Sequence, residues 1–389
     1  MSRVFVIAQG GGPTAVINQT VAGAALAARE KYPGSRVLGA RHGIRGVAAG
    51  DFVDLSAVSD ADLRRFADTP NSGLGSTRDK PDEAYCERIV AALQKVGADA
   101  FVYIGGNDTA GTMGILDRIE TGAMRFVHAP KTIDNDLVEN DHTPGYISAA
   151  WFVAAAFLSV DLDFRAMPGI YVGIVMGRHA GFLTAAAAAW RREGEGDGPH
   201  LVYVPEAHFS PEKLIADIKA ARETYGRCVV AMSEGVQTED GTPLAESLIP
   251  EDRKERDAHG NLQLSGGDLG LALQAAISAA FPKVRARVDT FGYLPRGFAG
   301  LISDVDRREA FDIGRFAIEA AERGSGSVAM QYADGRIALK LVPLEAVAGK
   351  TQHMPGDFVA AAGNDITAKC RAYLNRLVPP RPDAWTPFV

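Results

Sequence analysis

Cysteine is scarce in this chain, which has only Cys86, Cys228 and Cys370 among its 389 residues. Their odd number and wide separation exclude a disulfide framework and fit none of the cysteine and histidine spacings typical of zinc sites. Free thiols are typical of proteins in a reducing compartment, so we expect a cytoplasmic protein.

Long hydrophobic runs are also missing. The longest, Ile147 to Val160, has about fourteen residues, whereas a membrane-spanning helix needs roughly twenty. It predicts a buried helix. The opening run, Val4 to Ala8, is too short for the core of a signal peptide and leads directly into a glycine loop. We therefore expect no membrane partner.

An excess of basic residues is absent as well, because 41 lysines and arginines stand against 48 acidic residues, for a formal net charge of -7. Proteins with a broad nucleic-acid surface usually present a basic face, so we expect no nucleic-acid partner. Small anions are still candidates, because a phosphate pocket needs only a few local cations and backbone N–H groups.

The chain does contain a regular alternation of short apolar runs and helix-like segments from Val4 to Ala129. This alternation predicts parallel sheets with right-handed crossovers. Since neither an internal repeat nor a long linker is visible, we expect an α/β protein with two similar doubly wound, three-layer domains and the active site in the cleft between them. The predicted domains are 1–145 with about 295–335, and 146–294 with about 336–389.

Two loops at predicted strand ends carry most of the reactive side chains. One is Val102-Tyr-Ile-Gly-Gly-Asn-Asp-Thr109, and the other is Pro130-Lys-Thr-Ile-Asp-Asn-Asp136. Carboxylates at such edges can hold Mg²⁺ or accept a proton, and a lysine can offset the charge of a phosphoryl group. A single aspartate here is more often a turn former or helix cap. The density of acids and glycines on two neighbouring edges favours a reactive site.

Two further loops could contribute to binding an anion. The glycines Gly10 to Gly12 lie between a strand and a helix, where backbone N–H groups can approach a phosphate. Their spacing matches neither the dinucleotide fingerprint nor the Walker pattern, and a plain tight turn is the alternative. Arg78, in a loop of small residues, could clamp a phosphate with two hydrogen bonds, or could simply be a solvent-exposed arginine.

Seven segments, taken together, carry a resemblance to a known family. They are Gly11-Gly-Pro-Thr-Ala-Val-Ile-Asn18, Gly105-Gly-Asn-Asp-Thr109, Pro130-Lys-Thr-Ile-Asp-Asn-Asp136, Met176-Gly-Arg-His-Ala-Gly181, Pro205-Glu206, Ser233-Glu234 and Gly292-Tyr-Leu-Pro-Arg-Gly297. In this order the chain resembles the bacterial-type phosphofructokinases, and most closely their pyrophosphate-dependent branch. The resemblance implies a phosphoryl-donor-binding first domain and a sugar-phosphate-binding second domain.

The resemblance also implies individual roles. Asp134 would take the proton from the 1-hydroxyl of fructose 6-phosphate, with Thr132, Lys131 and Arg178 beside it at the reacting groups. The implied donor-binding residues are Gly11, Arg78, Asp108, Thr109 and Lys131, and the implied Mg²⁺ ligands are Asp108 and Asp136. The implied substrate-binding residues are Thr132, Asp134, Met176, Gly177, Arg178, Glu234, Arg287, Tyr293 and Arg296. Arg287 matches an arginine that reaches a neighbouring subunit, which implies a homodimer or homotetramer.

The choice of phosphoryl donor depends on Asp108 and Lys131, because ATP-using members of the family resemble sequences with glycine at both positions. A carboxylate at 108 would repel the α-phosphate of a nucleotide, whereas a lysine at 131 would add a cation beside pyrophosphate. The alternative for this pair is a structural ion pair with each other. Three departures from the family pattern are Asn107 for aspartate, Gly169 for arginine and Tyr293 for histidine.

The predicted activity is therefore reversible, Mg²⁺-dependent phosphoryl transfer from pyrophosphate to the C1 hydroxyl of fructose 6-phosphate, giving fructose 1,6-bisphosphate and phosphate. An ATP-dependent or sedoheptulose 7-phosphate-preferring enzyme of the same family is one alternative. A kinase of the NAD or lipid type, and a catalytically silent phosphosugar sensor, are the others.

Overall fold

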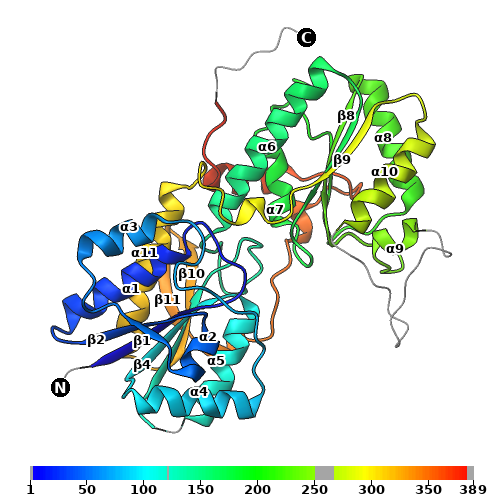
Figure 1. Ribbon diagram of the computed structural model, residues 1–389. Coiled ribbons are helices and arrows are strands. Elements are labelled where there is room, and N and C mark those ends of the chain that lie inside the picture. The colour runs from blue at the N-terminus through cyan, green and yellow to red at the C-terminus, as the bar shows by residue number, and fades with distance from the viewer. Residues whose placement is uncertain (1–2, 121, 250–266, 383–389) are drawn as a thin grey trace. The chain divides into compact units, whose positions relative to one another are not determined.

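The computed structural model describes residues 3–120, 122–249 and 267–382, which form two compact units (Figure 1). Unit 1 comprises the chain up to Ala149 together with Arg296–Gln352, and unit 2 comprises Ala150–Pro295 together with the chain from His353 onward. The two expected α/β units are thus present, and each is assembled from two separate stretches of sequence.

One predicted boundary is wrong. We expected residues from about 336 onward in the second domain, but the chain as far as Gln352 belongs to unit 1. The reason is a hairpin: strand β11 (Arg336–Val342) pairs antiparallel along its whole length with β10 (Gly326–Ala333). The turn residues Asp334 and Gly335 both have positive φ, which suits a two-residue hairpin turn.

The sheet of unit 1 has seven strands in the order β11-β10-β5-β4-β1-β2-β3. Its remaining strands are β1 (Val4–Gln9), β2 (Arg36–Ala40), β3 (Phe52–Asp54), β4 (Ala100–Gly105) and β5 (Arg125–Pro130). The five central strands run parallel, while β3 and β11 form antiparallel edges. Because β2 lies on one side of β1 and β4 on the other, the strand order reverses next to β1, as in doubly wound folds.

Helices cover both faces of this sheet (Figure 1). They are α1 (Ile17–Lys31), α2 (Ile44–Ala49), α3 (Asp60–Asp68), α4 (Glu83–Lys95), α5 (Asn107–Ile119), α11 (Asp304–Ala320) and α12 (Leu344–Val347). Helices α1, α3 and α11 enclose one apolar core against the sheet, and α2, α4 and α5 enclose a second core on the opposite face. Unit 1 therefore has the predicted three layers.

Helices α1 and α11 approach each other unusually closely. A Cβ atom added to Gly23 would lie 2.1 Å from the carbonyl oxygen of Phe311, and one added to Gly314 would lie 2.1 Å from that of Thr20. Only glycine fits at these two positions, one on each helix. The alanine-rich sequence of α1 keeps its surface flat enough for this contact, and the helix is buried over most of its length.

Unit 2 contains a smaller, fully parallel sheet in the order β7-β8-β6-β9. The strands are β6 (Ile170–Val175), β7 (Leu201–Tyr203), β8 (Cys228–Ser233) and β9 (Ala286–Thr290). The α-helices are α6 (Tyr146–Ala166), α7 (Phe182–Ala185), α8 (Pro211–Tyr225), α9 (Leu244–Leu248), α10 (Asp268–Ala280) and α13 (Ala368–Leu377). Three short 3₁₀ turns are also described, η1 (Ala186–Ala188), η3 (Leu294–Arg296) and η4 (Gly356–Phe358). Helices α8, α9 and α10 share one core with the sheet.

Helix α6 is longer than the apolar run that predicted it. By length and composition alone its 21 residues could cross a membrane, and 56% of its most apolar window is buried. Phe157 and Phe164 pack against Tyr171 of β6, with ring centroids 6.4 and 5.4 Å away. These contacts place α6 on the sheet face opposite α8 and α10, as the third layer of unit 2.

Candidate functional site

Three strands of unit 1 end side by side. Gln9 of β1 pairs with Ile104 of β4, and Gly105 pairs with Pro130 of β5. The loops that follow these strands therefore leave the same edge of the sheet, next to the point where the strand order reverses. Ligands of doubly wound sheets bind at such points, so the register brings the glycine loop and both predicted reactive loops together.

Lys131 crosses from the β5 loop to the glycine loop. Its side chain is buried, and its Nζ donates a 2.6 Å hydrogen bond to the carbonyl oxygen of Gly12. Gly11 has a φ of 72°, and a Cβ atom added to it would lie 3.4 Å from Nζ. Glycine at this position thus combines a left-handed backbone with close approach to a buried cation.

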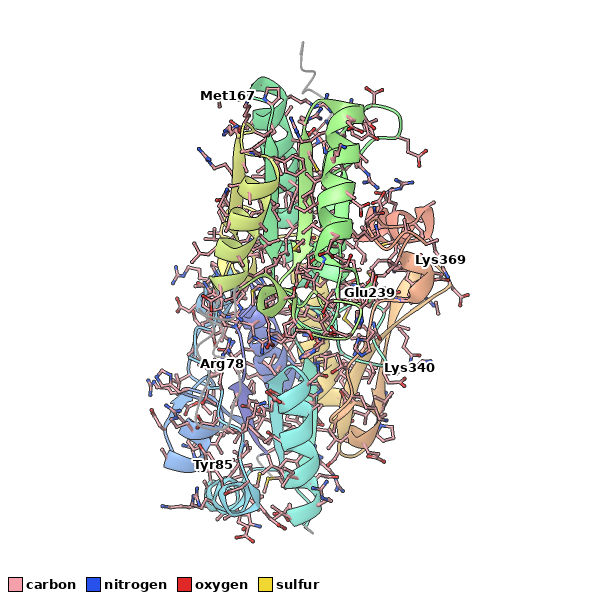
Figure 2. All side chains as sticks on the ribbon, turned by 90° about the vertical axis from the view of Figure 1, so that its right-hand side faces the viewer. Arg78, Tyr85, Met167, Glu239, Lys340 and Lys369 are labelled. Carbon is pink, nitrogen blue, oxygen red and sulfur yellow. The ribbon has the colours of Figure 1, made fainter. Side chains whose placement is uncertain are left out.

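Two arginines lie near this lysine. The guanidinium of Arg296 is 3.0 Å from the position of a Cβ atom added to Gly12, and Arg78 is exposed on the loop before α4 (Figure 2). Burial lowers the pKa of Lys131 to about 8, Asp134 and Asp136 act to raise it, and Arg296 and Arg78 act to lower it. The glycine loop is therefore flanked by three basic side chains, whose mutual repulsion a bound anion would relieve.

The β5 loop has a tight, internally bonded backbone. The Asp134 N–H donates to Thr132 Oγ1 at 3.1 Å, and Asn135 adopts a left-handed φ of 59°. Thr143 Oγ1 donates to the Thr132 carbonyl at 2.9 Å, and the Gln352 N–H donates to the Asp136 carbonyl at 2.7 Å. Thr143 and Gln352 thus fix the two ends of the loop around Asp134.

Asn107 and Asp136 form a polar pair between the two reactive loops. Asn107 Nδ2 donates to Asp136 Oδ2 at 2.9 Å. Asn107 Oδ1 is buried and accepts no hydrogen bond from the described part of the chain. Among the described residues no three His, Cys, Asp or Glu side chains gather as a metal cluster. One carboxylate and one amide oxygen suit Mg²⁺, which usually keeps several water ligands.

Asp108 does not form the ion pair with Lys131 that was the structural alternative. Its carboxylate lies 3.1 Å from Nζ of Lys80, and both side chains are mostly exposed. Thr109, the next residue, is buried. The structure therefore brings Gly11, Lys131 and Arg296 together but directs Asp108 toward Lys80 and Thr109 into the core.

In unit 2, predicted substrate-binding residues lie at the ends of two adjacent strands. Val175 of β6 pairs with Ser233 of β8, so Met176, Gly177 and Arg178 follow one strand while Glu234 follows the other. Ser233 Oγ donates to the Gly177 carbonyl at 2.5 Å, which ties the two turns together. The four predicted residues of these turns thus form one local group.

Three other predicted substrate residues are divided between the two units. Arg287 is an exposed residue of β9, and its Nη1 donates to the neighbouring Ala286 carbonyl at 2.7 Å. Tyr293 belongs to unit 2 and is 69% exposed, whereas Arg296 belongs to unit 1. Their common turn therefore contains the boundary between the units.

Sequence reasoning assigned no chemistry to His128, yet it supports the β4 loop. Its Nε2 lies 2.9 Å from the Gly105 carbonyl and its Nδ1 lies 2.8 Å from Ser327 Oγ. Burial lowers the pKa of His128 to about 4, so the ring is neutral and donates to the carbonyl from Nε2. Since Ser327 is 199 residues away in sequence, no local pattern could have revealed this support.

Comparison with known proteins gives a consistent result. The family model described as phosphofructokinase matches residues 4–321. A pyrophosphate–fructose 6-phosphate 1-phosphotransferase of Rhodospirillum rubrum is 47% identical over 96% of this chain and 93% of its own length. The enzyme of that name from Halomonas elongata is 34% identical over 95% and 90% of the two chains.

A solved structure agrees with these relatives. The pyrophosphate-dependent phosphofructokinase of Nitrosospira multiformis superposes with a TM-score of 0.85 at 28% identity, over all of this chain and 96% of the other. The family match covers most of the sequence, including the strands and loops that assemble the site in unit 1. This chain belongs to the phosphofructokinase family.

Proposed function

We propose that this protein catalyses reversible, Mg²⁺-dependent phosphoryl transfer from pyrophosphate to the C1 hydroxyl of fructose 6-phosphate, giving fructose 1,6-bisphosphate and phosphate. The observation that carries the proposal is the buried Lys131 at the carbonyl of Gly12, on the loop that also holds Asp134. The proposal is also supported by the 47% identity of the chain to a relative that is named for this reaction.

Unit 1 would bind the donor. Lys131 and Arg296 flank the glycine loop, and Arg78 adds a third basic group. Arg296 was predicted to bind the sugar phosphate, but because its guanidinium lies beside Gly12 we propose it as a donor contact instead. A compact diphosphate suits this arrangement, because its charge is concentrated within the reach of a few cations. The same cations would stabilise the charge on the transferring phosphoryl group and on the phosphate that leaves.

Asp134 would act as the general base. In the forward direction its carboxylate takes the proton from the C1 hydroxyl while that oxygen forms a bond to the terminal phosphorus of pyrophosphate. The bond from this phosphorus to the bridging oxygen breaks, and the bridging oxygen leaves with the departing phosphate. In reverse, protonated Asp134 returns the proton to C1 oxygen. Thr132 Oγ1 supports this role by accepting from the Asp134 backbone N–H.

Asp136 and the amide oxygen of Asn107 are the proposed Mg²⁺ ligands. When bound, the ion would neutralise charge on the diphosphate oxygens. Asp108 was predicted as a second carboxylate ligand, but it pairs with Lys80, and Asn107 is the residue that contacts Asp136. We therefore propose Asn107 in place of Asp108 in the metal site.

Unit 2 would bind the sugar phosphate. Met176, Gly177, Arg178 and Glu234 at the ends of β6 and β8 are the proposed contacts with the sugar. We propose Tyr293 as a contact with its 6-phosphate, where the phenol hydroxyl can donate a hydrogen bond. Arg287 would serve a neighbouring subunit of a homodimer or homotetramer, and its exposure on β9 supports this. Three buried, free cysteines support a cytoplasmic location.

The direct test supplies pyrophosphate or ATP separately with fructose 6-phosphate and Mg²⁺, and measures fructose 1,6-bisphosphate. We expect product with pyrophosphate, and phosphate-dependent formation of pyrophosphate in reverse. Product with ATP alone would overturn the donor assignment, and binding without turnover in either direction would indicate a sensor. Sedoheptulose 7-phosphate, NAD and a lipid acceptor complete the screen.

Asp108 is the position at which donor preference can be changed. Replacing Asp108 by Gly removes a carboxylate and frees the Lys80 ammonium, which could then contact a nucleotide phosphate. We expect the ratio of kcat/KM for ATP to that for pyrophosphate to rise about tenfold to a hundredfold. Asp108→Gly with Lys80→Met should lose much of this gain. An unchanged ratio in Asp108→Gly would contradict the role of Asp108 in excluding nucleotides.

A further inference from the structure

His142 lies in the segment that connects the β5 loop to helix α6, and its side chain is only 1% exposed. Its Nδ1 is 2.8 Å from Asp141 Oδ2, and its Nε2 is 2.7 Å from Glu309 Oε2 on helix α11. Ionised carboxylates only accept hydrogen bonds, so two carboxylate partners require a proton on each ring nitrogen. The ring is therefore a buried imidazolium between two acids.

The residues that follow His142 continue this attachment to α11. Asp306, one helical turn before Glu309, is fully buried and accepts from the Gly145 N–H at 2.8 Å and from Ser148 Oγ at 2.6 Å. Two carboxylates of α11 thus hold the connecting segment from 142 to 148. One does so through an ion pair, the other through hydrogen bonds.

The connecting segment in turn holds the reactive loop. Thr143, next to His142, donates from Oγ1 to the Thr132 carbonyl at 2.9 Å. Thr132 then accepts from the Asp134 N–H. If His142 moves, Asp134 is therefore expected to move with it, because the Thr143–Thr132 and Asp134–Thr132 hydrogen bonds connect the two segments.

The charges around His142 are predominantly negative. Asp141 faces it from its own segment, and Glu309 faces it from α11. Burial alone would lower the pKa of His142, but the hydrogen bonds to Asp141 and Glu309 outweigh it and raise the pKa to about 9. The imidazolium is therefore present below about pH 9 and is lost as the pH rises through that value.

We propose that His142 is a positioning residue for phosphoryl transfer: its ion pairs to Asp141 and Glu309 fix the segment that sets the place of Thr132 and Asp134. This inference rests on the function proposed above, because it assigns His142 an effect on the turnover of that site. It names no contact between His142 and a substrate.

The test compares His142→Gln and Glu309→Gln with the wild type and with Glu319→Gln, a change at an exposed position of the same helix. We expect His142→Gln to lower kcat about tenfold to a hundredfold, with KM for both substrates within about twofold, because misplaced groups mainly affect the transition state. In Glu309→Gln one carboxylate partner is neutral. The alkaline fall of kcat should therefore move below its wild-type position near pH 9 by about one pH unit.

A second measurement separates this inference from the proposed function. Amide hydrogen exchange at 132–136 should accelerate at least about tenfold in His142→Gln and remain unchanged in Glu319→Gln, with both proteins folded by circular dichroism. If the wild type lacks transfer activity, the proposed function fails while this readout still tests the attachment. Unchanged exchange, or unchanged kcat and pH profile in folded His142→Gln and Glu309→Gln, would overturn the role of His142.

Discussion

Asp134→Asn is expected to lower kcat by about 10²–10⁴-fold in both directions of phosphoryl transfer, while KM for either substrate changes little. The asparagine has nearly the same shape but cannot take a proton from the C1 hydroxyl. The Asp134 backbone N–H would still donate to Thr132 Oγ1, so the loop keeps its conformation. Steady-state kinetics in both directions would measure the effect.

The matched control is Asp136→Asn, two residues further along the same loop. It should raise the Mg²⁺ concentration required for half-maximal rate, because Asp136 is the proposed metal ligand beside Asn107. Excess Mg²⁺ should restore part of the rate in Asp136→Asn and none in Asp134→Asn. Retention of more than about a tenth of wild-type kcat by Asp134→Asn would rule out its role as the base.

Lys131→Met should produce the other large loss. Removal of a buried cation beside the glycine loop takes away charge stabilisation where the diphosphate and its transition state would lie. We expect kcat/KM for pyrophosphate to fall about 10²–10³-fold. The dissociation constant of fructose 6-phosphate, measured without donor, should stay within about threefold because most of its proposed contacts lie in unit 2 and none of them is Lys131. Equal losses of sugar affinity and donor use would contradict this division.

The pH dependence of kcat/KM for pyrophosphate is a second test of the role of Lys131. Since burial lowers its pKa to about 8 in the free protein, the ammonium is present below that pH and is lost above it. The kcat/KM for pyrophosphate should therefore decline as the pH rises through about 8. Lys131→Arg, which stays protonated, should lack this decline even if its activity is reduced. The same decline in the arginine variant would assign it to another group.

Much of the fold was predictable because its signals are local. Apolar runs that end in glycine or proline mark β1, β4 and β5, and the hydroxyls and carboxylates after them mark the reactive loops. Parallel strands deliver such loops to one edge, so the grouping in unit 1 follows from pattern and elementary topology.

The contacts that define the site in detail were not predictable. Lys131 meets Gly12 across 119 positions of sequence, and His142 meets Glu309 across 167. Asp108 forms its ion pair with Lys80 rather than with Lys131, although either lysine would neutralise its charge. Which residues form these hydrogen bonds and ion pairs depends on the direction of each side chain and on the order of strands that are distant in sequence. Neither can be read from composition or from motif spacing.

The close contact of α1 with α11 has a consequence for synthesis. In the apolar core of unit 1, α1 packs against α11 (Asp304–Ala320), and the edge of β5 is covered by β10. A chain emerging from the ribosome therefore presents α1 and β5 long before the elements that cover them. Unit 1 therefore cannot complete its fold until residues 150 to 295 and the stretch after them have been synthesised. Nascent or truncated chains that stop before Asp304 would expose a sheet edge and an apolar helix surface, the features by which chaperones recognise clients and by which fragments aggregate.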